Sequence, residues 1–348
     1  MDRGFLKSQP VYWREAALCA PALPVCLLVG LATGQVAYGA VAAGAAFSVG
    51  FGAARDLRGR RWGAMLAAVA GTTATAFVGC LAGQSVAVLL VVAGMAAAGC
   101  AVLALYDEDL WWVSLQMVIA LLVAGHFPGG VQPAATRAAV VLAGGGAQVL
   151  IVMILARLAP HAAGRLPAAP AKPAPERQLV ISHAIRAAVV VDIALAIAWK
   201  LGLANSYWAP MTAMLILKPG LSDTHTRGLA RFAGTIVGCV AASLYALAVF
   251  YYAPLLLVGI GLTGCAAYAL QKAHYAVLTT AVTATVVLLL SLAYGGHALT
   301  NAEHRVIATL VGGAVALIVA RIAPHRPLDQ HASVDRVGAA PTAESGVA

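Results

Sequence analysis

Long apolar stretches separated by short polar segments run along almost the whole of the 348-residue chain. Most are about 17 to 25 residues long, which is the length that an α-helix needs to cross a bilayer. None alternates with the period of two that a membrane barrel strand would show. The pattern predicts two sets of six transmembrane helices, at 16–34, 36–54, 62–83, 85–106, 109–127 and 136–158, then at 182–203, 205–220, 229–249, 253–271, 273–294 and 303–322.

Two polar segments rich in Ala and Pro interrupt this pattern. The first, APHAAGRLPAAPAKPAPERQL, has too few apolar residues to form a core and favours an extended linker. The second follows His325 and is expected to be a disordered tail. The predicted organisation is a first six-helix repeat at 1–158, a linker at 159–181, a second six-helix repeat at 182–322 and a tail at 323–348.

Composition agrees with a polytopic membrane protein, because 61% of the residues are hydrophobic and only 10% are charged. The fold class is therefore all-α transmembrane. The basic first segment, MDRGFLKSQPVYWRE, is interpreted as a retained cytosolic end. With the N- and C-termini in the cytosol, all but three of the 22 basic residues fall on the cytosolic side, as the positive-inside rule expects.

The two sets of helices resemble copies of each other. The sixth helix ends in ARLAPH and the twelfth in ARIAPH. Arg137 stands seven residues before Gly144, and Arg305 stands seven before Gly312. Since each set has an even number of crossings, the repeats would share one topology and be related by a pseudo-two-fold axis along the membrane normal. A substrate pathway is expected between them.

The eighth predicted helix is unusually short. The 14 residues from Ser206 to Pro219 reach about 21 Å, against a hydrocarbon core of about 30 Å. Short or Pro-interrupted helices are typical of transporter binding sites, although a tilted ordinary helix from 203 to 221 is the alternative. Tyr207 and Trp208 at its start would stack on an aromatic ligand or anchor to headgroups, and Thr212 would offer a hydroxyl to a carboxylate.

The ninth helix carries a stripe of polar and small residues at helical spacing. Thr224, Arg227, Arg231, Gly234 and Gly238 follow one another by three, four, three and four residues, which places them on one face. The glycines allow close helix packing. The arginines suit a carboxylate ligand, or else serve the positive-inside rule.

Three further charged residues interrupt the expected membrane pattern. Arg137 and Arg305 lie at matching outer ends of the sixth and twelfth helices, where they would attract anions, or else snorkel or pair, with Glu303 available to Arg305. Asp192 lies near the middle of the seventh helix, where it is either a proton-coupling carboxylate or one member of a buried pair with an arginine.

No sequence has the spacing of a phosphate-binding loop, a zinc site or a nucleophile elbow, and the six cysteines all lie in apolar stretches. We therefore predict no enzyme activity, no metal, no cofactor and no nucleic-acid partner. The expected partners are the lipid bilayer and a small organic anion.

The motifs YWAPMTAMLILKP, TxxRxxxRxxGTxxG from Thr224 to Gly238, and RVIATLVGG from Arg305 resemble the fusaric acid resistance protein-like superfamily. That superfamily includes the bacterial aromatic acid exporters and is related to the plant aluminium-activated malate channels. Similarity is strongest over 182–322. The resemblance implies an inner-membrane efflux permease for organic acids, and it marks these residues as signature positions: Trp208, Thr212, Arg227, Arg231, Gly234 and Thr235.

The first half departs from this pattern. Gly39 stands where the tryptophan is expected, and Ala68 stands where an arginine is expected. Many exporters of this group also carry large cytosolic domains that this sequence lacks. Any selective site should therefore be asymmetric and built mostly from the second repeat.

The favoured hypothesis is export of aromatic carboxylates from the cytosol along a path between the repeats. A passive anion channel and a non-transporting envelope scaffold are the alternatives. A duplicated chain supplies a two-fold arrangement by itself, so both a monomer and a homodimer are consistent with the sequence, and a periplasmic adaptor protein is a further partner that the export hypothesis allows.

Overall fold

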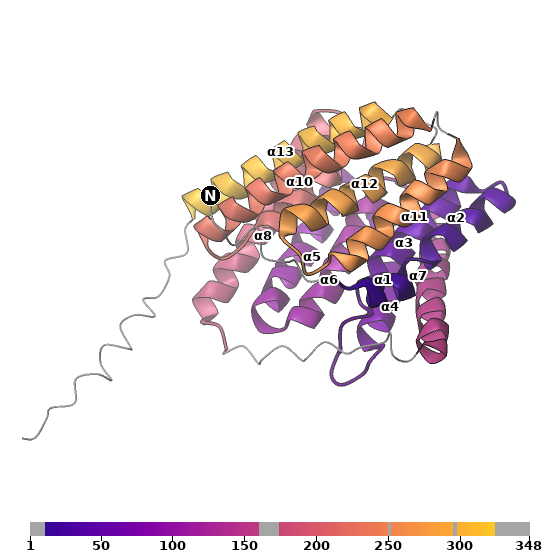
Figure 1. The fold of residues 1–348 in the computed structure, drawn as a ribbon. Coiled ribbons are helices and arrows are strands. Elements are labelled where there is room, and N and C mark those ends of the chain that lie inside the picture. Colours follow the sequence, from indigo (N-terminus) through magenta and orange to yellow (C-terminus); the bar gives the residue numbers. More distant parts are fainter. Residues whose placement is uncertain (1–10, 160–173, 250–251, 295–297, 324–348) are drawn as a thin grey trace, which may run out of the picture.

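The computed structural model describes residues 11–159, 174–249, 252–294 and 298–323, and its regular elements are helices (Figure 1). The predicted tail at 323–348 falls outside these residues except for its first residue, and residues 160–173 of the predicted linker also fall outside. The last five residues of that linker, 177–181, are the first turn of α8, so the helix begins earlier than predicted. In the first half the helices are α1 (Trp13–Cys19), α2 (Ala22–Ala32), α3 (Val36–Gly50), α4 (Gly63–Ala82), α5 (Val86–Tyr106), α6 (Glu108–Gly125) and α7 (Val131–Leu158). In the second half they are α8 (Arg177–Lys200), α9 (Trp208–Ile216), α10 (Leu221–Ala248), α11 (Ala253–Ala269), α12 (Tyr275–Tyr294) and α13 (Ala298–Ile322).

Most of these helices are long and apolar enough to cross a membrane. Among the described residues nine segments meet that condition, with α1 and α2 taken together as Trp13–Ala32, and α3 and α11 are shorter apolar helices. Each half therefore contributes six helical segments in the described part of the chain when the short α9 is included. The prediction of an all-α membrane protein is confirmed.

The short helix α9 falls where the sequence predicts one, but it is even shorter than expected. Its nine residues rise about 13 Å, less than half of the hydrocarbon thickness. It ends at Leu217, whose ψ of 124° leaves the helical region, and Pro219 disfavours a helical Lys218. The alternative of one continuous tilted helix over 203–221 is therefore wrong.

Matching helices pack in the same combinations in the two halves. In the first half α4 packs on α6 and α7, and α3 packs on α7. In the second half α10 packs on α12 and α13, and α9 packs on α13; α10, α12 and α13 run side by side in Figure 1. Across the halves, α5 packs on α8, and α11 packs on α1 and α2. Each half thus places its fourth helical segment against the first segment of the other half.

Glycines allow the closest of these helix contacts. A Cβ on Gly144 of α7 would collide with the Ala42 carbonyl of α3, and one on Gly312 of α13 would collide with the Ala209 carbonyl of α9. On α10, Gly234 and Gly238 lie against the backbone of α12 in the same way. These glycines therefore lie where the sequence places helix-packing residues, because backbones this close leave no room for a side chain.

Candidate functional site

A cavity of about 800 Å³ lies between the two halves. Its walls come mainly from α3, α4, α6 and α7 of the first half and from α9, α10, α12 and α13 of the second. Six of the eight residues that the sequence marks as substrate-binding line it, namely Tyr207, Trp208, Arg227, Arg231, Arg137 and Arg305. The two halves therefore enclose the cavity where a pathway is expected.

The other two predicted substrate residues, Thr212 and Thr235, do not line this cavity. Both are fully buried, and neither hydroxyl has a hydrogen-bond partner among the described residues. Thr212 packs against the backbone of α13 at Gly312. The structure therefore places Thr212 at a helix contact, and a substrate contact for either threonine stays a prediction.

Arg305 of α13 lies deeper than its predicted position at an outer mouth. Its side chain is only 3% exposed, and its Cζ atom lies 4.7 Å above the centre of the Trp208 ring. Glu303 forms no ion pair with it among the described residues, where both ion pairs involve Arg55. Trp208 therefore holds the guanidinium group through a cation–π contact.

Arg231 of α10 brings a second buried positive charge to the same cavity. It is 5% exposed, and its Nη1 donates to the Tyr275 hydroxyl over 3.1 Å. Its charge and that of Arg305 repel each other. The Nε atoms of both arginines are buried and have no hydrogen-bond partner in the described part of the chain. Two positive charges thus share one buried space, and no acid among the described residues pairs with either of them.

Arg227 lies one helical turn before Arg231 but makes different contacts. Its Nε donates to the Leu215 carbonyl at the end of α9 over 2.8 Å. Its guanidinium group also lies 3.9 Å from the centre of the Tyr275 ring. Arg227 therefore satisfies a carbonyl that the end of the short helix leaves without an intrahelical partner.

Thr224 and Arg186 stabilise the same break in the chain. The Thr224 hydroxyl lies within 3.2 Å of the Lys218 and Gly220 carbonyls and accepts a hydrogen bond from the Lys218 amide. Arg186 of α8, which is 4% exposed, donates to the Lys218 and Pro219 carbonyls over 3.4 and 3.2 Å. The first two motif residues of α10 thus support α9, while the third, Arg231, faces the cavity.

Sequence reasoning did not find Tyr275 and Arg186. Tyr275 begins α12 and contacts both motif arginines, but it belongs to no recognised motif. The basic-residue distribution places Arg186 on the cytosolic side and gives it no further role. Its position within an apolar helix is the signal that it needs a hydrogen-bonding partner.

The cavity lining is strongly cationic. Among the described lining residues Glu108 is the one acid, whereas the bases are Arg55, Arg137, Lys218, Arg227, Arg231, Lys272 and Arg305. Arg137 stacks over the Phe127 ring at 4.3 Å. Such an excess of positive charge in a low-dielectric space favours an anion as the occupant.

Comparison with known proteins identifies part of the chain. Residues 193–319 match the family described as "Fusaric acid resistance protein-like". Over this segment the chain is similar to the fusaric acid resistance protein-like family. The resemblance predicted from the motifs is confirmed there, and the segment contains Trp208, Arg227, Arg231, Tyr275 and Arg305.

The chain is also similar to a curated protein, inner membrane protein YccS of Escherichia coli (strain K12). The two are 31% identical over 137 residues, which is 38% of this chain and 18% of that protein. The chain thus spans less than a fifth of the length of this relative. No solved structure matches the chain.

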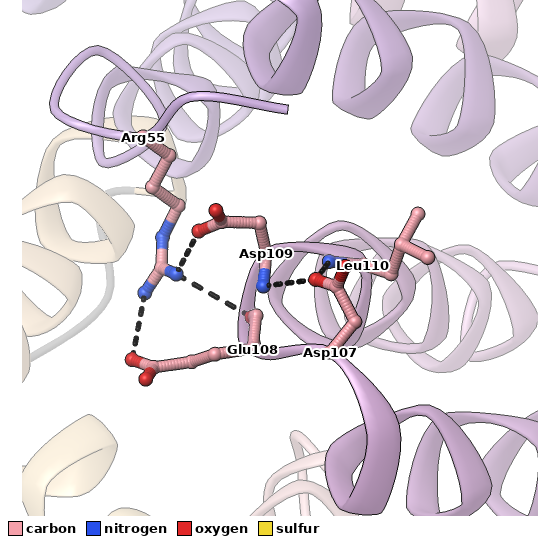
Figure 2. A network of polar contacts seen from close by, with 5 residues as sticks. All are labelled: Arg55, Asp107, Glu108, Asp109 and Leu110. Carbon is pink, nitrogen blue, oxygen red and sulfur yellow. Dashed lines mark hydrogen bonds and ion pairs between the residues drawn. The ribbon is translucent and has the colours of Figure 1, made fainter. Parts of the chain in front are cut away.

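Glu108, the one acid among the described lining residues, lies outside the segment that matches the fusaric acid resistance-like family. Figure 2 shows Arg55, in the loop after α3, pointing at the first turn of α6. Its guanidinium group lies 2.8 Å from Asp109 and 3.9 Å from Glu108, and Asp107 caps the helix by accepting from the Asp109 and Leu110 amides. Arg55 thus pairs mainly with Asp109, and Glu108 lies at the limit of ion-pair distance.

Asp192 also lies just outside that segment and away from the cavity. It is on α8 and faces α5, where one of its oxygens occupies the space that a side chain at Gly94 would need. Its other oxygen is buried without a hydrogen-bond partner among the described residues. No arginine among the described residues pairs with it, so that part of the chain contains no buried Asp–Arg pair at Asp192.

Proposed function

We propose that this protein transports small organic anions, with aromatic carboxylates favoured, through the cavity between its halves. The observation that carries the proposal is the pair of buried arginines, Arg231 and Arg305, which face one cavity without an acidic partner among the described residues. Burying an unpaired charge is costly, and a bound carboxylate would offset that cost for both arginines.

The shape and the other walls of the cavity support an aromatic acid. A volume of about 800 Å³ is within the range of small-molecule sites, about 300–1,000 Å³. Trp208 and Tyr207 lie beside Arg305, with ring centres 5.7 Å apart, and Trp111 and Trp112 line the opposite half. Aromatic walls with arginine forks suit a ligand that has a ring at one end and a carboxylate at the other.

The arrangement of the halves supports passage through the membrane. Matching helix pairs make matching contacts, which agrees with two six-helix repeats related by a pseudo-two-fold axis along the membrane normal. The cavity is lined both by Lys218 and Lys272, on the predicted cytosolic side, and by Arg137, on the predicted outer side. An anion would therefore meet positive charge on both sides of the membrane.

We place the protein in the inner membrane with both termini in the cytosol, on the strength of its apolar helices, its inner-membrane relative and its basic-residue distribution. Export is then the favourable direction, because an elementary negative charge gains about 2.3 kcal/mol per 100 mV on leaving a negative cytosol. A monovalent acid anion would leave without an additional energy source.

Flux through the purified protein tests this proposal. Proteoliposomes loaded with benzoate should release it faster when the inside is negative than when it is positive, with saturation at high benzoate. Liposomes that contain benzoate but no protein provide the control. Equal release from both preparations, across a panel of aromatic and aliphatic acids and at both polarities, would contradict a transport function, and release without saturation would favour a channel.

We further propose that Asp192 couples transport to proton movement, since one of its carboxylate oxygens is buried without a hydrogen-bond partner and no arginine pairs with it in the described structure. Replacing Asp192 with asparagine should remove any dependence of benzoate flux on an imposed pH gradient and leave the voltage dependence unchanged. A pH dependence equal to that of the unaltered protein would assign Asp192 to helix packing against Gly94 instead.

A further inference from the structure

A second, smaller cavity of about 280 Å³ lies next to the first. Residues of α5, α6, α8 and α9 line it, together with the segment that follows α9. Four residues, Ala104, Trp111, Leu215 and Lys218, line both cavities and so form part of the wall between them. The other contributors include the apolar residues Cys100, Ala101 and Met214 and the buried His183.

The other contact between a fourth helical segment and the opposite half, that of α11, is filled by a tyrosine. There α11 packs on α1 and α2, just as α5 packs on α8, and Tyr268 of α11 reaches the end of α3. Tyr268 is completely buried, its hydroxyl donates to the Phe47 carbonyl over 2.9 Å, and its ring lies 5.4 Å from that of Phe47 and 4.8 Å from that of Phe51.

The two contacts between the halves differ in their side chains. Tyr268 fills the contact of α11, whereas alanines and a cysteine of α5 line the smaller cavity beside α8 and α9. Gly50 at the end of α3 makes room for the Tyr268 ring, and a Cβ there would overlap that ring. At the end of α9 the space between α5, α8 and α9 is left as the smaller cavity.

We infer that the smaller cavity is a binding site for a single-ring aromatic molecule with one polar substituent, such as a phenol. Its volume is ample, since an apolar cavity of about 150 Å³ is enough to hold benzene. The alanines and Met214 would contact the ring. The Lys218 ammonium group, 5.3 Å from the centre of the Trp111 ring, would face its oxygen.

This site does not depend on the proposed transport function. The larger cavity selects by charge through Arg231 and Arg305, whereas the smaller cavity selects by ring size and would accept a neutral phenol. Because Trp111 and Lys218 belong to both walls, a ring bound in the smaller cavity would lie directly beside the larger one.

Binding of 4-fluorophenol, followed by fluorine NMR on the purified full-length protein in detergent micelles, tests the inference. Saturable binding that p-cresol displaces is expected. The variant Ala101→Tyr places a ring in the smaller cavity and should weaken binding at least tenfold. The control Val91→Tyr adds the same ring on the same helix at a position that is 61% exposed, and should bind like the unaltered protein.

Two further variants distinguish binding in the smaller cavity from binding in the larger one, and a loss of binding from a failure to fold. Arg305→Gln should keep 4-fluorophenol binding even where it loses benzoate binding. Ala101→Leu, which fills less of the smaller cavity at the same position, should weaken binding if Ala101→Tyr cannot be purified. The inference would be overturned by the absence of saturable binding to the unaltered protein, or by binding that neither cavity-filling variant changes.

Discussion

Replacing Arg305 with glutamine is expected to lower benzoate flux by about 10- to 100-fold at equal amounts of protein in the membrane. A hydrogen bond to a charged group contributes about 1.5–3 kcal/mol, and about 1.4 kcal/mol corresponds to a tenfold change in affinity. Glutamine keeps a donor over the Trp208 ring but removes the charge. The protein should still fold, because the variant no longer buries an unpaired cation among the described residues.

A matched variant on the same helix separates this effect from a general change in charge. Arg321 lies in the last turn of α13, is exposed, and does not line the cavity, so Arg321→Gln should leave flux nearly unchanged. Arg231→Ala should reduce flux as Arg305→Gln does. If both cavity variants transported benzoate like Arg321→Gln, the two arginines would not be anion ligands.

The second large effect is expected from Gly312→Ala. A methyl group at Gly312 would collide with the Ala209 carbonyl and lie 3.0 Å from the Ala213 nitrogen, so α13 and α9 would have to separate. Overpacking of this kind typically costs about 1–3 kcal/mol. Because Arg305 and Trp208 lie on these two helices, separation should lower both the thermal midpoint in detergent and the affinity for benzoate.

The neighbouring glycine provides the control. A methyl group at Gly313 would meet only the Ile216 Cδ1 atom, at 3.7 Å, which is an ordinary contact. Alanine is about 1 kcal/mol better than glycine inside a helix, so Gly313→Ala should be neutral or slightly stabilising. Equal thermal midpoints for the two variants would show that the approach of α9 to α13 is not tight.

Local sequence patterns were sufficient to predict the helices of this fold. Hydrophobic stretches give the order of the helical segments, and Pro219 with the short stretch before it predicts a helix too short to span. The helical spacing of Arg231, Gly234 and Gly238 also places them on one face of α10, as the structure shows. These features depend on residues close together in the chain.

The roles of individual arginines depend on contacts that the sequence does not encode locally. Arg227 and Arg231 share a motif and a helix but make different contacts. Arg227 donates a hydrogen bond to the end of α9, whereas Arg231 donates to the Tyr275 hydroxyl beside the cavity. Arg305 lies over a tryptophan almost one hundred positions earlier in the chain. The packing of α5 on α8, which forms the smaller cavity, joins the two halves and could not be predicted from either alone.

Calorimetric titration with benzoate and with its neutral counterpart benzamide tests most directly whether the buried arginines select an anion. The two ligands share a ring and nearly the same shape, so the difference in their affinities measures recognition of the charge. We expect benzoate to bind at least tenfold more tightly than benzamide, and Arg305→Gln to remove most of that preference. Equal affinities for the two ligands, or a preference that survives in both Arg305→Gln and Arg231→Ala, would contradict an anion site at these arginines.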